Sequence, residues 1–132
     1  MYDLDLARQI LRQILWSTET IRKRFEPIRS AVEFRRDERG LEKLDAICMQ
    51  LIAIGESVKD LDKVTAGSLL PQYPEIEWKQ VMGIRDVLSH HYFDIDEEVV
   101  FAVCTDHLAS LTATIRRMLK DLPPSTSEEG SD

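Results

Sequence analysis

The stretch LDLARQILRQILWSTETIRKRF, residues Leu4 to Phe25, decides the fold class of this chain. Its apolar residues recur at intervals of three and four, which places them on one face of an α-helix with 3.6 residues per turn. Asp3 and Asp5 suit the positive N-terminal end of a helix, and the three bases that begin at Arg22 suit the negative C-terminal end. Pro27 then ends or kinks the helix. The stretch therefore predicts an amphipathic helix.

Three further stretches have the same helical periodicity. Between them, the segment 28–40 fits either a short helix or a loop that Gly40 breaks, and the connector 63–73 has room for at most one helical turn. The further helices are expected over residues 41–62, from 74 or 75 to about 92, and from an N-cap at Asp94 or Asp96 to about residue 120.

Four amphipathic helices with mostly short connectors predict an all-α fold, an antiparallel bundle of four to five helices. We expect one domain over residues 1–121, followed by a disordered polar tail over residues 122–132 that has two prolines near its start. Two of the apolar stripes are broad enough to leave apolar surface beyond a monomer's core. From this we predict a homodimer.

Composition narrows the setting of the protein. The N-terminal sequence MYDLDLARQ has acids where a signal peptide carries bases, and no apolar run is long enough to span a bilayer. We therefore expect a cytoplasmic protein that does not contact a membrane. Cys48 and Cys104 each fall within an apolar stripe, so we expect two reduced core residues in preference to a metal pair or a disulfide.

The charge of the chain is unevenly distributed. The net charge is −7, which does not favour nucleic-acid binding. Residues 1–40 nevertheless hold nine Lys or Arg against seven Asp or Glu, whereas residues 41–132 hold eight against seventeen. The basic part fits either a local patch that faces phosphates or the solvated face and end of a helix, and charge alone favours the solvated face.

Reactive side chains are concentrated in the segment RDVLSHHY, Arg85 to Tyr92. Asp86 and His90 are four residues apart, so on a helix they share a face, where the carboxylate can accept a ring N–H and raise the basicity of the imidazole. Arg85 and His90 are five residues apart, which is about 140° of rotation on an ideal helix. A joint site therefore requires that the helix end at His90 or that a second copy of the chain supply the other half.

An arginine and a histidine together suit the cleavage of an RNA phosphodiester without a metal. The imidazole can take the 2′-hydroxyl proton or protonate the leaving 5′-oxygen, and the guanidinium can hold the phosphate. Two other interpretations stay open. The residues fit simple caps and salt bridges at a helix end, which the residues alone favour, or a metal site made from His90, His91, Asp94 and Asp96.

A family resemblance changes this balance. The pattern R-x-x-x-x-H-x-Y, formed by Arg85, His90 and Tyr92, resembles the signature of HepT toxins in the HEPN superfamily. The surrounding YPEIEWKQVMGIRDVLSHHYFDID (residues 73–96) is similar to that family's third helix and following turn, and IAIGESVKDL (residues 52–61) is similar to its second-helix motif. The arginine–histidine spacing alone is a weak pattern, but the combination is specific and covers nearly the whole chain before the tail.

The resemblance implies a helical bundle that dimerises and brings both motifs to a shared cleft. It implies a toxin that is a metal-independent endoribonuclease with no cofactor, as in members that cleave transfer RNA. It also implies an antitoxin partner, an MntA-like minimal nucleotidyltransferase that transfers AMP to a tyrosine. Carried over to this sequence, Arg85 and His90 are the catalytic pair and Tyr92 is the modification site, where an adenylyl phosphate would repel RNA.

Other residues take supporting roles in this hypothesis. Asp86 is assigned an orienting role, and His91, at the variable position of the motif, a supporting one. Glu56 either pairs with Arg85 across the bundle or faces solvent, and the sequence favours neither. His107, alone on the last predicted helix, is expected on the surface.

Two glycines, Gly55 and Gly83, are expected to permit close approach between helices. The competing function is a HEPN module without catalytic activity that binds a nucleotidyltransferase, and the net acidity of the chain slightly favours it.

Overall fold

The computed structural model describes residues 2–89 and 94–124. Over those residues the chain forms six α-helices and two short 3₁₀ helices, which confirms the all-α prediction. The elements are α1 (Leu4–Phe25), η1 (Ala31–Arg35), α2 (Glu38–Val64), η2 (Leu70–Gln72), α3 (Trp78–Met82), α4 (Ile84–Leu88), α5 (Glu97–Asp106) and α6 (Leu108–Asp121).

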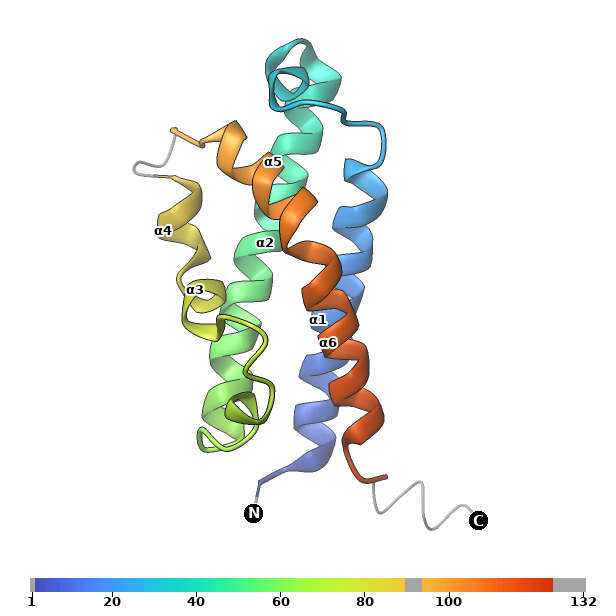
Figure 1. Ribbon diagram of the computed structural model, residues 1–132, viewed down its shortest axis with the longest axis vertical. Coiled ribbons are helices and arrows are strands. Elements are labelled where there is room, and N and C mark those ends of the chain that lie inside the picture. Colours follow the sequence, from blue (N-terminus) through green and yellow to red (C-terminus); the bar gives the residue numbers. More distant parts are fainter. Residues whose placement is uncertain (1, 90–93, 125–132) are drawn as a thin grey trace.

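The helices form an up-and-down bundle in which the third and fourth passes are each divided into two helices (Figure 1). Helix α2 lies at the centre, with α1 packed along one side of it and α3 and α4 along another. Helix α6 packs against α1, and α5, which precedes α6 in the chain, packs against η1 and α4. The short helices α3 and α4 therefore lie at the edge of the bundle.

The first helix has the bounds that its sequence predicts, because its apolar stripe forms the core. Burial of a Leu or Ile side chain contributes roughly 1.5–3 kcal/mol each, so this stripe stabilises both the helix and its contact with α2. Asp3 caps the helix by accepting a hydrogen bond from the backbone N–H of Leu6 at 3.0 Å. The residues of the stripe that are buried are Ala7, Ile10, Leu11, Ile14, Thr18 and Ile21.

The prediction that Gly40 breaks the chain was wrong, because α2 begins at Glu38 and includes Gly40. Asp37 caps this helix by accepting a hydrogen bond from the Gly40 N–H at 2.8 Å. A Cβ atom at Gly40 would lie 2.2 Å from the Glu33 carbonyl oxygen. The glycine therefore serves close packing of the first turn of α2 against η1.

The predicted third helix is shorter than expected and divided. It starts at Trp78, because the buried Trp78 indole N–H donates to the Tyr73 carbonyl at 2.9 Å and so holds the preceding residues in a turn. Gly83, with φ −95° and ψ 17°, separates α3 from α4. The expectation of close helix approach is confirmed for Gly55, where an added Cβ would lie 2.8 Å from the Val81 carbonyl oxygen, whereas Gly83 provides the break.

The predicted fourth helix is also divided. His107, with φ −122° and ψ −27°, ends α5 and precedes α6, and the two helices are bent by 49°. Over residues 2–89 and 94–124, no single helix is long and apolar enough to cross a membrane, although the bent α5–α6 pair reaches the threshold by length and composition.

Both cysteines are free thiols in the core, as the sequence predicts. Burial raises the pKa of the Cys48 thiol to about 11. Burial, with a smaller effect from Cys48, raises the pKa of the Cys104 thiol to about 12. Both groups are therefore protonated at neutral pH and poor nucleophiles.

Candidate functional site

Helix α4 carries the arginine of the motif at the edge of the bundle. Leu88 is 1% exposed and anchors the end of the helix in the core. Arg85, Asp86 and Val87 are exposed. In a single continuous helix, Arg85 would lie on the same buried face as Trp78, seven residues earlier. The break at Gly83 changes the direction of the chain after α3, so Arg85 does not share that face.

The chain leaves the helix before it reaches His90. Ser89 is extended, with φ −157° and ψ 138°, and forms an antiparallel bridge with Ile95. The Asp96 N–H donates to the Leu88 carbonyl at 2.9 Å. The helical i, i+4 relation that placed Asp86 and His90 on one face is therefore wrong, because the helix ends at Leu88 and the backbone is extended at Ser89. The alternative condition for a joint site, a helix that ends by His90, is met.

Three predicted site residues, His90, His91 and Tyr92, lie outside the described residues. The structure describes both flanks of the segment that contains them. Because Ser89 and Ile95 are bridged, the segment starts and ends at neighbouring points at the end of α4. The roles of these three residues stay predictions.

The suggested pairing of Glu56 with Arg85 is not found, and the solvent-exposed interpretation holds. The Glu56 side chain is 56% exposed and lies 3.5 Å from the Lys59 ammonium on the same helix. The preceding residue, Gly55, faces α3, and one residue of helix rotates the next side chain by about 100°. This rotation carries Glu56 away from the side of α2 that α3 covers.

The sequence analysis did not predict the contact that Arg35 makes with Ile95 and Glu97, at the start of α5. Its Nε donates to Glu97 Oε2 at 2.7 Å, and its Nη2 donates to the Ile95 carbonyl at 2.7 Å. The hydrogen bond from Arg35 is the main reason that the pKa of Glu97 lies below its usual value. In the sequence, Arg35 belongs to the basic part of the chain, and no local pattern links it to residues about sixty positions later.

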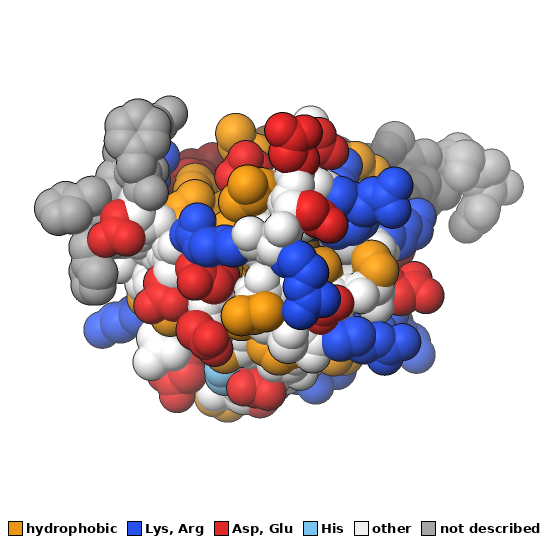
Figure 2. Space-filling view, turned by 90° about the horizontal axis from the view of Figure 1, so that it is seen from above, with side chains coloured by type: hydrophobic (Ala, Val, Ile, Leu, Met, Phe, Trp, Pro, Cys, Tyr) orange, Lys and Arg blue, Asp and Glu red, His pale blue; other side chains and the backbone are white. Residues whose placement is uncertain are grey.

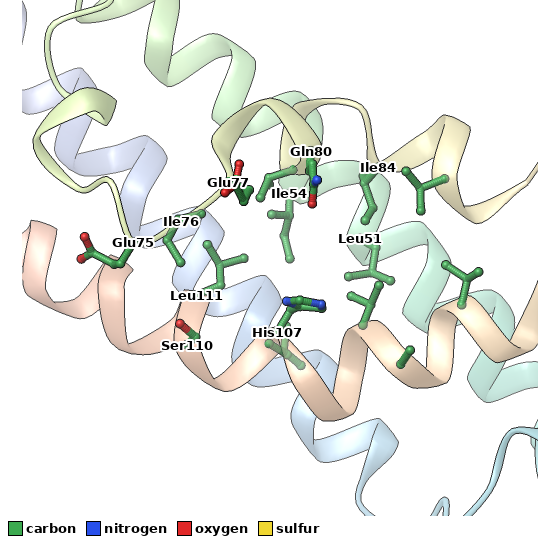
Figure 3. Close-up of a pocket in the computed structure, with 16 residues that line it drawn as sticks. Leu51, Ile54, Glu75, Ile76, Glu77, Gln80, Ile84, His107, Ser110 and Leu111 are labelled. Atoms are coloured by element: carbon green, nitrogen blue, oxygen red, sulfur yellow. The ribbon is translucent and has the colours of Figure 1, made fainter.

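An apolar pocket of about 480 Å³ lies beside α4, between α2, α3, α5 and α6. Figure 3 shows Leu51, Ile54 and Ile84 turned toward this space, with Gln80 of α3 and His107 on opposite sides. Val87, the other α4 residue that lines the pocket, is 50% exposed. His107 is exposed, as predicted, but lines the pocket.

Among residues 2–89 and 94–124, no group of three or more His, Cys, Asp or Glu side chains is arranged to hold a metal ion. The metal alternative also uses His90 and His91, which lie outside those residues. Asp96, a third member of that set, caps α5 by accepting hydrogen bonds from the backbone N–H groups of Glu98 and Val99 at 3.0 and 3.2 Å. Its carboxylate is thus already engaged.

Comparison with known proteins places this bundle in a family. Residues 14–118 match the family described as "Ribonuclease HepT-like", a span that includes α4 and the whole motif. The chain therefore belongs to the HepT-like ribonuclease family. No solved structure shows significant similarity to the chain.

Three curated relatives illustrate the similarity. A "Putative RNase" of Methanocaldococcus jannaschii is 30% identical over 90 residues, 68% of this chain and 69% of the relative. A second "Putative RNase" of the same organism is 31% identical over 77 residues, 58% of this chain and 63% of the relative. A "Probable ribonuclease HepT" of Thermococcus cleftensis is 28% identical over 75 residues, 57% of this chain and 64% of the relative. The last two matches span less than two thirds of each relative.

Proposed function

We propose that this protein is a metal-independent endoribonuclease, the toxin of a toxin–antitoxin pair, with Arg85 and His90 at its reacting centre. The observation that carries the proposal is the state of Arg85 within the HepT-like fold. Arg85 is exposed on α4, and among the described residues no carboxylate pairs with it. An exposed guanidinium that no described carboxylate engages is available to a phosphate.

The proposed reaction is an internal transfer at phosphorus. The 2′-oxygen of the RNA attacks the adjacent phosphate and loses its proton to a base, while the bond to the 5′-oxygen breaks and that oxygen takes up a proton. The products are a 2′,3′-cyclic phosphate and a 5′-hydroxyl. His90 supplies the proton transfers, and Arg85 stabilises the negative charge that develops on the phosphate. Transfer RNA is the substrate class to test first.

The roles of the remaining predicted residues are narrower. Asp86 is exposed next to Arg85 and, with the helix ended at Leu88, can orient His90 only across a turn. His91 stays a supporting candidate. Glu56 has no place in the proposed centre, because it pairs with Lys59 in solvent.

The apolar pocket beside α4 supports the proposal that the active form is a homodimer. Two residues that line the pocket, Ile84 and Val87, flank Arg85 in the sequence of α4. A second copy of the chain that packs on this pocket would therefore bring two copies of Arg85 close to one two-fold axis. Val87→Asp should lower the dimer fraction in sedimentation, whereas Met49→Asp should leave it unchanged. Met49 is 67% exposed but does not line the pocket.

We further propose that an MntA-like minimal nucleotidyltransferase neutralises the protein by AMP transfer to Tyr92. The phenol oxygen would attack the α-phosphate of ATP, with loss of its proton and release of pyrophosphate. The added phosphate would bring negative charge to the segment between Ser89 and Ile95, which follows Arg85 closely in the sequence, and there it would repel an RNA phosphate. Intact mass after co-expression with the partner should show adenylyl increments that Tyr92→Phe removes. Unmodified wild-type protein would contradict this form of neutralisation.

The experiment that tests the catalytic proposal is RNA cleavage by purified protein in excess chelator. Arg85→Ala and His90→Ala should each reduce cleavage by at least about a hundredfold. Arg12→Ala, which removes an exposed arginine from α1, should leave it unchanged. Cleavage that survives both changes at the motif would contradict the proposal.

The second candidate is a HEPN module without catalytic activity that docks a nucleotidyltransferase, and the net charge of −7 favours it. It predicts a tight complex and no toxicity on expression. Growth arrest that depends on His90 would exclude it.

A further inference from the structure

Arg35 joins the N-terminal half of the chain to the segment that follows the motif. Its guanidinium uses two donors on one edge. Nε bonds Glu97 Oε2 in the first turn of α5, and Nη2 bonds the Ile95 carbonyl, both at 2.7 Å. The two acceptors lie on the same short stretch, two residues apart. One planar group therefore sets both the position and the direction of the chain where it enters α5.

The element that carries Arg35 is itself held in place. The neighbouring Phe34 is fully buried, and its ring centroid lies 6.3 Å from that of Phe25. Phe25 in turn lies 5.3 Å from Phe101 of α5. Glu33 closes the start of η1 by accepting hydrogen bonds from the backbone N–H groups of Arg29 and Ser30 at 2.6 Å. The guanidinium thus extends from a packed element.

The stretch that Arg35 holds is also the outgoing flank of the motif segment. Ile95, whose carbonyl accepts from Arg35, is the residue bridged to Ser89. The next residue, Asp96, donates its N–H to the Leu88 carbonyl at the end of α4. Two hydrogen bonds in series, from Arg35 to Ile95 and from Asp96 to Leu88, therefore connect η1, the start of α5 and the end of the helix that carries Arg85.

We propose that Arg35 is a positioning residue for the ribonuclease centre, because it fixes the α4–α5 junction from which the segment with His90 and Tyr92 extends. This inference rests on the proposed function. Arg35 acts through Ile95 and Glu97 and does not touch the RNA. A displacement of about 1 Å at a reacting group can lower a rate about a hundredfold, so a junction held by a few polar bonds is sensitive to the loss of one anchor.

The competing role for Arg35 is a phosphate contact within the basic part of the chain. The geometry opposes that role, because Nε and Nη2 are both engaged by acceptors of the protein. Glu97 also neutralises its charge. Figure 2 shows this end of the bundle, where Lys and Arg side chains are interspersed with Asp and Glu and do not form one continuous basic face.

The ion pair is partly exposed, 46% for the Arg35 side chain and 30% for that of Glu97. Exposed ion pairs contribute little to global stability. The expected consequence of removing Arg35 is therefore a loss of turnover and not of folding, and this difference separates positioning from a merely structural role.

The test is steady-state cleavage of one defined RNA by full-length wild-type protein, Arg35→Ala, Arg35→Lys, Glu97→Gln and the double variant Arg35→Ala/Glu97→Gln. Arg36→Ala is the matched control, since Arg36 is the next residue, is exposed and makes no ion pair among the described residues. Hydrogen exchange at the Asp96 amide reports on the junction without any need for activity.

Arg35→Ala should lower kcat by about tenfold to a hundredfold with KM unchanged, and Arg36→Ala should change neither constant. The kcat of Arg35→Lys should lie between those of the wild type and Arg35→Ala, because an ammonium cannot donate along two fixed directions as a guanidinium does. The double variant should be no slower than Arg35→Ala alone, and the Asp96 amide should exchange faster in Arg35→Ala. If Arg35→Ala does not fold, Arg35→Lys and Glu97→Gln carry the same comparison.

A rise in KM with a shallower salt dependence would show that Arg35 contacts phosphate, and it would overturn the proposal. Equal losses in Arg35→Ala and Arg36→Ala, or an unchanged kcat in Arg35→Ala, would overturn it as well. Failure of the underlying function is separate, because in that case Arg85→Ala would also leave cleavage unchanged. Hydrogen exchange at Asp96 would then still decide whether Arg35 holds the junction.

Discussion

The α1–α2 pair and the α4–α5 junction are stabilised by different interactions. Helices α1 and α2 are long and meet along buried apolar stripes, in which Leu11 and Ile47 have no exposed surface. Helix α4 has five residues, of which Leu88 alone is buried. A backbone hydrogen bond from Asp96 to Leu88 and the bridge between Ser89 and Ile95 connect it to the start of α5, which the Arg35 guanidinium holds. The pair supplies stability, and the junction supplies geometry to the proposed site. Changes in the two regions should therefore affect different measurements.

The largest effect is expected in the α1–α2 pair. Leu11→Ala removes a fully buried side chain, so it should lower the free energy of unfolding by about 3–5 kcal/mol. Urea denaturation measures this directly. Leu6→Ala on the same helix is the control, because Leu6 is 39% exposed and should cost much less. Equal losses in the two variants would contradict the core that we describe.

Arg85→Ala should give the opposite pattern at the junction. Loss of a group that stabilises charge in the transition state typically lowers kcat about 10²–10³-fold, or about 2.7–4 kcal/mol. The melting temperature should stay unchanged because the side chain is exposed and has no ion pair among the described residues. Lys79→Ala, an exposed base on α3, controls for general charge effects. A large drop in melting temperature for Arg85→Ala would assign Arg85 to the scaffold instead.

Gly40→Ala should affect both regions, because Gly40 lies where α2 meets the element that carries Arg35. Helix propensity favours alanine by up to about 1 kcal/mol. The added Cβ, however, would lie 2.2 Å from the Glu33 carbonyl oxygen, so η1 must move. We expect a net loss of about 1–3 kcal/mol in unfolding free energy, together with a lower kcat. Arg39→Ala, one residue earlier and exposed, should show neither effect.

The smallest effect concerns alkaline pH and involves neither region directly. Burial raises the pKa of Tyr73 to about 12, and the hydrogen bond to Asp121 and the negative charge of Asp121 act in the same direction. Between about pH 10, where an unfolded tyrosine ionises, and pH 12, the unfolded chain loses a proton that the folded chain keeps. Stability should therefore fall as the pH rises through that window.

Tyr73→Phe should flatten this alkaline decline and cost about 0.5–1.5 kcal/mol at neutral pH, since it removes the 2.8 Å hydrogen bond to Asp121. Denaturation at a series of pH values measures both effects. Tyr2→Phe serves as the control. A decline that is equally steep in Tyr73→Phe would show that other groups cause it.

Sequence periodicity predicted the scaffold well because long helices are governed by local rules. The bounds of α1, from Leu4 to Phe25, follow from a continuous stripe, a capping aspartate and a run of bases before Pro27. The third and fourth passes were predicted as single helices and are each divided. Periodicity continues through Gly83 and His107, and only packing against the rest of the bundle decides that the backbone turns there.

The sequence named the residues of the candidate site, whose roles stay predictions, but it did not give their arrangement. Arg85 and Asp86 were identified from the motif, and both are exposed at the edge of the bundle. The helical relation between Asp86 and His90 failed because Ser89 pairs with Ile95 across the segment. The same principle explains Glu56, which was assigned to solvent or to Arg85 with equal weight, until the packing of Gly55 against α3 decided its direction.

The amino-acid sequence by itself determined the helical class, the buried stripes, the two core thiols and the segment that holds the reactive side chains. These properties depend on the order of neighbouring residues, which a periodic pattern records. Only the tertiary structure decided where the helices break, that η1 packs closely against Gly40, and that Arg35 binds Ile95 and Glu97. Those contacts join residues up to sixty positions apart, and their partners are set by how the folded helices meet in space.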